Sequence, residues 1–127
     1  MTTGSLATTL LRMEQPARWG LARVHGRSMA PVLSPGDRLL VDYRRRPRPG
    51  DVVAARFADG TLAVKRVDSE RTTRSGGRGW WLVSDNPEEG VDSRHRGPVA
   101  DEDVLGVVRV RVWPRPRRLS RRVTQPG

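Results

Sequence analysis

The chain has 127 residues, a net charge of +10 and 35% apolar residues, a composition that suits one small domain with a modest core. It has no cysteine and only two histidines, so disulfides, a thiol nucleophile and thiolate metal sites are excluded, and we expect no metal or cofactor. No apolar run could span a membrane, and residues 1–19 lack the apolar core of a secretory signal, so we expect a cytoplasmic protein.

Turn residues divide the chain into short apolar segments. Residues 1–19 predict a weakly ordered or helical N-terminal segment, and apolar alternation predicts strands after it. The expected strands are 21–26, 38–43, 52–57, 61–67, 79–83 and 104–112. The Asp59-Gly60 pair predicts a hairpin, residues 70–79 an exposed loop, and residues 101–103 one helical turn.

These strands predict a mostly β fold, a compact and partly closed barrel-like domain over residues 20–113. Pro114 and Pro116 should end regular structure and leave a basic tail at 114–127. Seven arginines and no acid lie in 109–127, which leaves the rest of the chain at about +3. Because charge runs are usually solvated, we expect no specific nucleic-acid binding, although the tail could contact an anionic membrane surface.

Lys65 is the only lysine in the chain, where 24 residues are lysine or arginine. Arginine stays charged, whereas a buried lysine can lose its proton and act as a general base. Alternation places Lys65 on one strand face with the small apolar residues Ala63 and Val67. A coding bias toward arginine would also leave one lysine, but the local pattern favours a lysine that must be neutral at times.

Ser28 is the candidate nucleophile that such a base could activate. It follows Gly26 in a turn, where the backbone can approach a substrate and main-chain N–H groups could stabilise an oxyanion. Most serines in turns only form the turn, so this motif alone does not establish catalysis.

Several motifs occur in an order that carries a family resemblance. They are Gly26-x-Ser28-Met29-x-Pro31-x-Leu33 with Gly36-Asp37, then Gly50-Asp51-Val52-Val53, Val64-Lys65-Arg66-Val67, Asp85-Asn86 and Asp92-Ser93-Arg94. The series resembles the boxes of type I signal peptidases, which are serine proteases with a Ser/Lys dyad and are related in fold to LexA-type peptidase domains. The resemblance runs from about residue 24 to residue 106.

The resemblance implies that Ser28 is the nucleophile and Lys65 its general base. It also implies a precursor protein or peptide as partner, bound in extended form with small residues before the cleaved bond. Gly26 stands where some members carry a hydroxyl of the oxyanion hole, which leaves that role to backbone N–H groups. Met29 and Pro31 either line the substrate groove or serve only in packing.

Other motif residues are expected to support the site. Asp92 and Arg94 should form an ion pair, and Asp85 and Asn86 should cap a turn through hydrogen bonds to the backbone. His25 is interpreted as a bystander because a lysine base is available.

Two features near Lys65 leave alternatives open. Members of the resembled family that carry Asn-Ser-x-Asp-Ser-Arg orient the lysine with the first of these serines. Gly90 stands at that place here, so the resemblance leaves a backbone carbonyl or Ser93 for this role. Arg66 either raises the cost of protonating Lys65 or is a solvated strand residue.

The small size and the missing anchor make nickel-type superoxide dismutase maturation proteases the most similar members; these remove a short leader from a cytoplasmic precursor. One alternative is a LexA-type self-cleaving regulator, although the 27 residues before Ser28 hold no helix-turn-helix. The other is a non-catalytic, basic, nucleic-acid-binding β-barrel.

Overall fold

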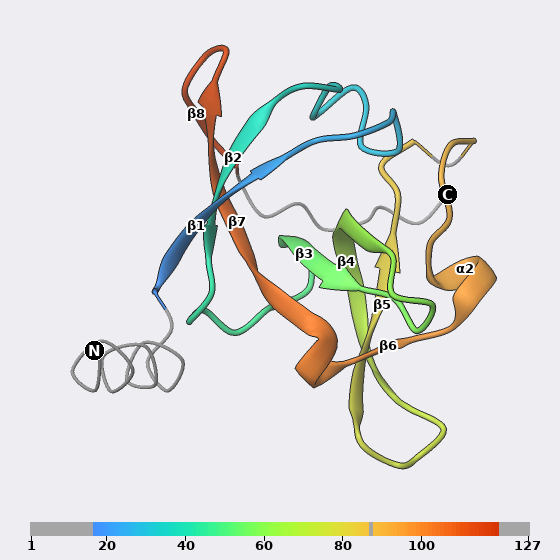
Figure 1. Ribbon diagram of the computed structural model, residues 1–127. Helices are drawn as coiled ribbons and strands as arrows, with labels where there is room; N and C mark the ends of the chain where they lie inside the picture. The colour runs from blue at the N-terminus through green and yellow to red at the C-terminus, as the bar shows by residue number, and fades with distance from the viewer. Residues whose placement is uncertain (1–16, 87, 120–127) are drawn as a thin grey trace, which may run out of the picture.

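The computed structural model describes residues 17–86 and 88–119, which form a curled antiparallel sheet with two short helical elements (Figure 1). In chain order the elements are β1 (Trp19–Arg23), β2 (Arg38–Asp42), β3 (Val52–Arg56), β4 (Leu62–Thr72), β5 (Arg78–Val83), α2 (Ser93–Arg96), β6 (Val99–Ala100), η1 (Asp101–Asp103), β7 (Val104–Trp113) and β8 (Arg117–Arg118). The predicted mostly β fold is confirmed. No helix in the described ranges is long and apolar enough to cross a membrane.

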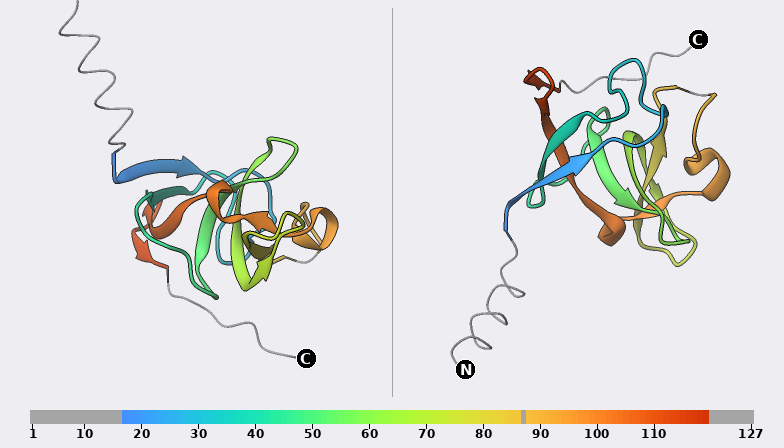
Figure 2. Two further views of the ribbon diagram at one scale, coloured as in Figure 1. Left: turned by 90° about the horizontal axis from the view of Figure 1, so that it is seen from below. Right: turned by 45° about the horizontal axis from the view of Figure 1, so that its top comes forward.

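The order of strands across the sheet is β1-β2-β7-β3-β4-β5-β6, and β8 pairs with β7. Every pairing is antiparallel. The sheet curls along this order into the partly closed, half-barrel shape that Figures 1 and 2 show from three directions. The Asp59-Gly60 hairpin joins β3 to β4 as predicted, and η1 is the predicted helical turn.

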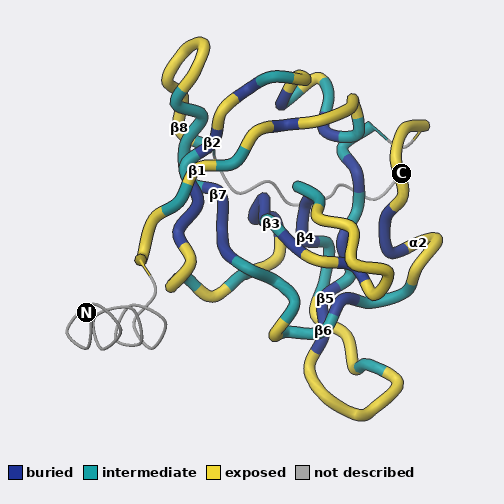
Figure 3. The backbone as a smooth tube through the Cα atoms, in the orientation of Figure 1, coloured by how far each residue is buried: buried dark blue, intermediate teal, exposed yellow. Residues whose placement is uncertain are grey.

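Two apolar clusters form the core, one on each face of the central strands. Val53 and Val107 belong to the first cluster, whereas their neighbours Val52 and Val108 belong to the second. Successive residues of a strand point to opposite faces, so β3 and β7 are covered on both sides. Figure 3 shows the resulting buried track through the centre of the molecule. The segment between β1 and β2 supplies part of the second cluster and is therefore packed onto the sheet.

The predicted exposed loop at 70–79 is wrong at both of its ends, although residues 73–77 do form an exposed loop. β4 continues to Thr72 and β5 begins at Arg78, so these polar residues pair as a long hairpin. The side chains give the physical reason: the Arg71 guanidinium lies 4.6 Å from the ring centre of Trp81. Cross-strand contacts of this kind stabilise the hairpin, although its polar composition predicts a loop.

The sequence predicts that regular structure ends at Pro114 and Pro116, and this prediction is also wrong. Arg117 and Arg118 form β8 against β7, and Arg117 donates a hydrogen bond to the Val32 carbonyl at 2.7 Å. Leu119 packs against the second core cluster. The start of the basic tail is thus part of the fold, while the predictions for residues 1–16 and 120–127 lie outside the described residues.

Truncation of the tail tests this role. Removal of residues 114–127 should lower the free energy of unfolding by about 1–3 kcal/mol, because the chain loses the β7–β8 pairing and the packing of Leu119. Urea denaturation measures the change. The matched control removes only residues 120–127 and should leave the stability unchanged. Equal stability of both truncated chains and the wild type would contradict an ordered role for β8.

Candidate active site

Ser28 lies in a tight turn between β1 and β2 that the core anchors on both sides. Gly26 before it has a φ of 74°, a left-handed conformation that favours glycine. Met29 and Leu33 are buried in the second cluster, and the Leu33 N–H donates to the Met29 carbonyl at 2.9 Å. The turn is therefore held in place while Ser28 itself stays partly exposed.

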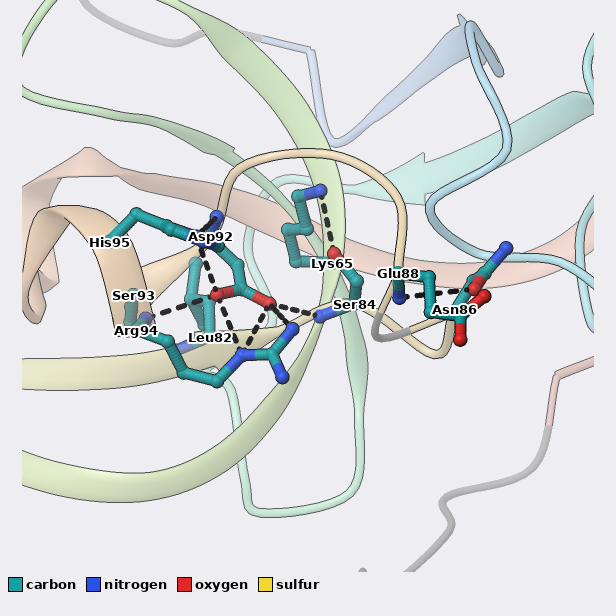
Figure 4. A network of polar contacts seen from close by, with 9 residues as sticks. All are labelled: Lys65, Leu82, Ser84, Asn86, Glu88, Asp92, Ser93, Arg94 and His95. Atoms are coloured by element: carbon teal, nitrogen blue, oxygen red, sulfur yellow. Dashed lines mark hydrogen bonds and ion pairs between the residues drawn. The ribbon is translucent and has the colours of Figure 1, made fainter.

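Lys65 lies on β4 opposite Val53 of β3 and is only 3% exposed. Its Nζ donates a hydrogen bond to the Ser84 hydroxyl at 3.1 Å (Figure 4). Burial lowers the pKa of Lys65 below its ordinary value, because the ammonium form loses hydration. The negative charge of Asp92 opposes this pKa shift, and the positive charge of Arg94 adds to it.

The two candidate residues meet at Gly90. A Cβ atom placed on Gly90 would lie 2.7 Å from Ser28 Cβ and 3.0 Å from Lys65 Nζ. The structure thus brings the predicted nucleophile and the predicted base to opposite sides of one small space. Gly90 also has a φ of 77°, so both its conformation and its lack of a side chain keep this space open. Any side chain at this position would clash with Ser28.

The partner of the Lys65 amine is Ser84, which is not among the residues that the sequence predicts. The expected alternative, Ser93, instead accepts a hydrogen bond from the Leu82 N–H at 2.9 Å and ties α2 to β5. Ser84 is buried directly after β5, and its N–H donates to the Asp92 carboxylate at 2.9 Å. The available signal was its position immediately before Asp85-Asn86, in a motif otherwise assigned to a turn.

Asp92 and Arg94 form the predicted ion pair, with 2.9 Å between Arg94 Nη2 and Asp92 Oδ2. The Asp92 carboxylate is fully buried and also caps α2 by accepting from the Arg94 N–H (Figure 4). Burial by itself would raise the pKa of Asp92, but the hydrogen bonds from Arg94 and from the Ser84 N–H outweigh it and lower the pKa to about 2. The Asp92 carboxylate is therefore ionised at neutral pH close to Lys65, and the positive charge of Arg94 compensates its negative charge.

Arg66 is not the solvated residue that one sequence interpretation expects. Only 4% of it is exposed, and its guanidinium makes two hydrogen bonds of 2.8 Å to the Asp85 carboxylate. A third bond of 2.8 Å goes from Nη1 to the Gly50 carbonyl. Asp85 thus fixes the segment after β5 to β4 through a buried ion pair, in addition to any part it has in the predicted turn.

Asn86 connects the same segment to the turn that holds Ser28. Its N–H donates to the Ser28 carbonyl at 2.8 Å, and its side-chain amide donates to the Arg27 carbonyl at 3.3 Å. Its side-chain oxygen also accepts from the Glu88 N–H at 3.3 Å, which is the predicted turn cap. Residues 84–86 therefore contact Lys65, Arg66 and the Ser28 turn in succession.

A cleft of about 620 Å³ opens at this site. Its lining includes Gly26, Ser28, Met29 and Lys65 together with the last residues of β1 and the first residues of β4. Met29 combines both predicted roles, since it is buried in the core and also borders the cleft, whereas the exposed Pro31 does not line it. His25 is exposed at the rim.

Within residues 17–86 and 88–119, no three acidic, histidine or cysteine side chains gather as a metal site.

Replacement of Asp92 by Asn tests the buried anion. The free energy of unfolding should fall by about 1–3 kcal/mol at neutral pH, because Arg94 and the Ser84 N–H lose a charged acceptor. The Asp92 pKa is depressed in the fold, so its contribution is present above about pH 4 and is lost as the pH falls toward about 2.

Urea titrations at several pH values should therefore show the gap between wild type and Asp92→Asn closing over this acid range. Asp59→Asn, at an exposed ion pair with Arg96, is the control and should have little effect. A gap that stays constant with pH would contradict the assignment.

The family model described as Peptidase S24-like matches residues 4–109, a range that contains Ser28, Lys65 and the residues that surround them. No curated protein matches the chain significantly.

Proposed function

Because this chain belongs to the Peptidase S24-like family, which indicates serine-type peptidase activity, we propose that it is an endopeptidase with Ser28 as nucleophile and Lys65 as general base. The observation that supports these roles most strongly is the convergence of Ser28 and the buried amine of Lys65 at the side-chain-free position of Gly90.

The proposed reaction begins with a neutral Lys65. The amine accepts the hydroxyl proton of Ser28 while Oγ attacks the scissile carbonyl, and backbone N–H groups at the turn stabilise the oxyanion. Lys65 then gives this proton to the leaving amine, which departs and leaves an acyl-enzyme. Water then enters and attacks the ester carbonyl while Lys65 takes one of its protons. Lys65 returns this proton to Ser28 Oγ as the ester bond breaks, which releases the acid product and restores the Ser28 hydroxyl and the neutral amine.

The charges around Lys65 support a neutral base. A lone buried carboxylate next to the amine would hold the proton on lysine, since an opposite charge favours the ammonium form. Here Arg94 pairs with Asp92, so the two charges act on the Lys65 pKa in opposite directions and burial leaves it lowered. The ion pair thus supplies structure without holding the Lys65 amine in its charged form.

At the finer level we propose that the substrate is a precursor protein from which a short N-terminal leader is removed, with nickel-type superoxide dismutase as the candidate precursor. The motif resemblance supports this specificity, and the long cleft beside two strands suits a peptide bound in extended form. The family match is equally compatible with LexA-type self-cleavage, so the experiment must separate cleavage of another chain from cleavage of its own.

The experiment incubates wild type, Ser28→Ala and Lys65→Arg with candidate precursors and reads new termini by mass spectrometry. Wild type should cut the precursor, and both variants should lose about a hundredfold or more of the rate, because a guanidinium cannot act as the base. Appreciable cleavage by Lys65→Arg would contradict the dyad. A wild-type chain that shortens itself and leaves every precursor intact would favour the self-cleaving alternative.

Ser84 is the proposed positioning residue for Lys65, and Ser84→Ala tests it. We expect kcat to fall about tenfold or more with little change in KM, because the amine loses the partner that orients it. Rates should rise with pH through the lowered pKa of Lys65 in the wild type. Loss of the hydroxyl acceptor disfavours the ammonium form further, so the rising limb should move to lower pH.

Ser84→Thr should restore the rate, and Ser75→Ala, in the exposed hairpin loop, is the matched control. A lower kcat with an unmoved pH profile would assign Ser84 a merely structural role.

A further inference from the structure

Positive charge gathers at one end of the sheet, where β1, β2, β7 and β8 lie side by side (Figure 1). These four strands contain six arginines and one acid. The acid is Asp42, which is fully buried and pairs with Arg18. No exposed carboxylate of these strands therefore balances their arginines, and this end of the sheet presents a positive surface.

The strand registers place arginine, aromatic and apolar side chains on one face of this end. Directly paired residues of antiparallel strands share a face. Two neighbouring rows form what we call the outer face: Arg23, Arg38 and Trp113 in one row, and Leu21, Leu40, Val110 and Arg118 in the next. Neither core cluster includes these residues, whereas the alternate residues Ala22 and Leu39 belong to the second cluster on the opposite face.

An arginine stacks on each of two exposed tryptophans at the outer face. The Arg38 guanidinium lies 5.2 Å from the ring centre of Trp113, which is 53% exposed. The Arg18 guanidinium lies 4.9 Å from the ring centre of Trp19, which is 43% exposed and shares the face because it precedes Leu21 by two residues on β1. Open aromatic rings among guanidinium groups are the combination that holds single-stranded nucleic acids, since bases stack on the rings and phosphates pair with the charges.

We propose that the outer face binds a single-stranded nucleic acid without sequence specificity. Bases stack on the two tryptophans, and phosphates contact the arginines beside them. Trp19 and Trp113 lie four residues apart along the strands and two strands apart, which is about 16 Å, so an extended polymer reaches both rings and a small anion does not. The inference does not depend on the proposed peptidase activity, because Lys65 lies on another strand of the sheet.

Charge argues against two other occupants of this face. A second copy of this chain would bring the same excess of arginine to the contact, and like charges would oppose the pairing. A bilayer is the stronger competitor, because exposed tryptophans also suit a membrane interface. However, the arginine on Trp19 is held by the Asp42 carboxylate at 3.1 Å, so burial of that ring in hydrocarbon would take charged groups with it at a high cost.

Fluorescence anisotropy with a labelled oligothymidylate of about 15 nucleotides tests the proposal on the full chain. Binding by wild type should weaken steeply as the salt concentration rises, because phosphate contacts release counterions. Trp113→Ala should weaken binding about fivefold or more at fixed salt, because one base loses its stacking partner. Arg118→Gln should weaken binding and also lower the slope of log Kd against log salt by about 0.7, the value for one phosphate contact on a single strand.

Leu62→Ala and Arg74→Gln are the matched controls, since both residues are exposed and lie on β4 and in the loop after it, outside the outer face. Both should bind as wild type does. The Arg118→Gln arm keeps the test decisive where loss of Trp113 unfolds the chain.

The remaining outcomes would each overturn the proposal. They are undetectable binding by wild type, an unchanged affinity in Trp113→Ala and Arg118→Gln, or an equal loss in Arg74→Gln, which would indicate a general effect of charge. Sedimentation with phosphatidylglycerol vesicles examines the competing occupant. If Trp113→Ala lost vesicle binding but kept its affinity for the oligonucleotide, the face would belong to a membrane instead.

Discussion

The burial of one lysine amine is the constraint on which the site depends. Lys65 is held on a central strand with its Nζ against the Ser84 hydroxyl, and removal from water lowers its pKa. This burial opposes the charged form, so the surrounding fold must supply the stability that the site costs. The buried charge of Asp92 beside this site is itself compensated, because Arg94 lies 2.9 Å from it and because Asp92 caps α2.

One short segment then connects the proposed base to the proposed nucleophile. Residues 84–86 bind in turn the amine of Lys65, the guanidinium of Arg66 and the carbonyl of Ser28. A shift of this segment would move both sides of the site together and preserve their separation. Gly90 completes the arrangement, since a side chain at this position would fill the space next to both Ser28 and the Lys65 amine. The motif at residues 84–86, which the sequence predicts to be only a turn, therefore connects the two proposed catalytic residues.

Strand positions could be predicted from local patterns and the candidate pair from the family resemblance of the ordered motifs, whereas the cross-connections between strands could not. Alternation around Lys65 and the Asp59-Gly60 turn are local signals, and both led to the correct strands. The position of Ser84 before Asp85-Asn86 marks it as part of a motif but does not indicate that it binds lysine, because that role depends on a partner on another strand. The paired polar hairpin and the β8 strand were missed for the same reason: Trp81 and Val32 stabilise them from distant parts of the chain.

The most direct test of this account is an NMR titration of Lys65. Because the chain has one lysine, labelling of lysine alone gives a single side-chain signal that needs no further assignment. The account predicts a titration midpoint well below that of an exposed lysine, in wild type and in Ser28→Ala alike. A midpoint at the ordinary lysine value would show that the amine stays charged at neutral pH and would contradict its role as the base.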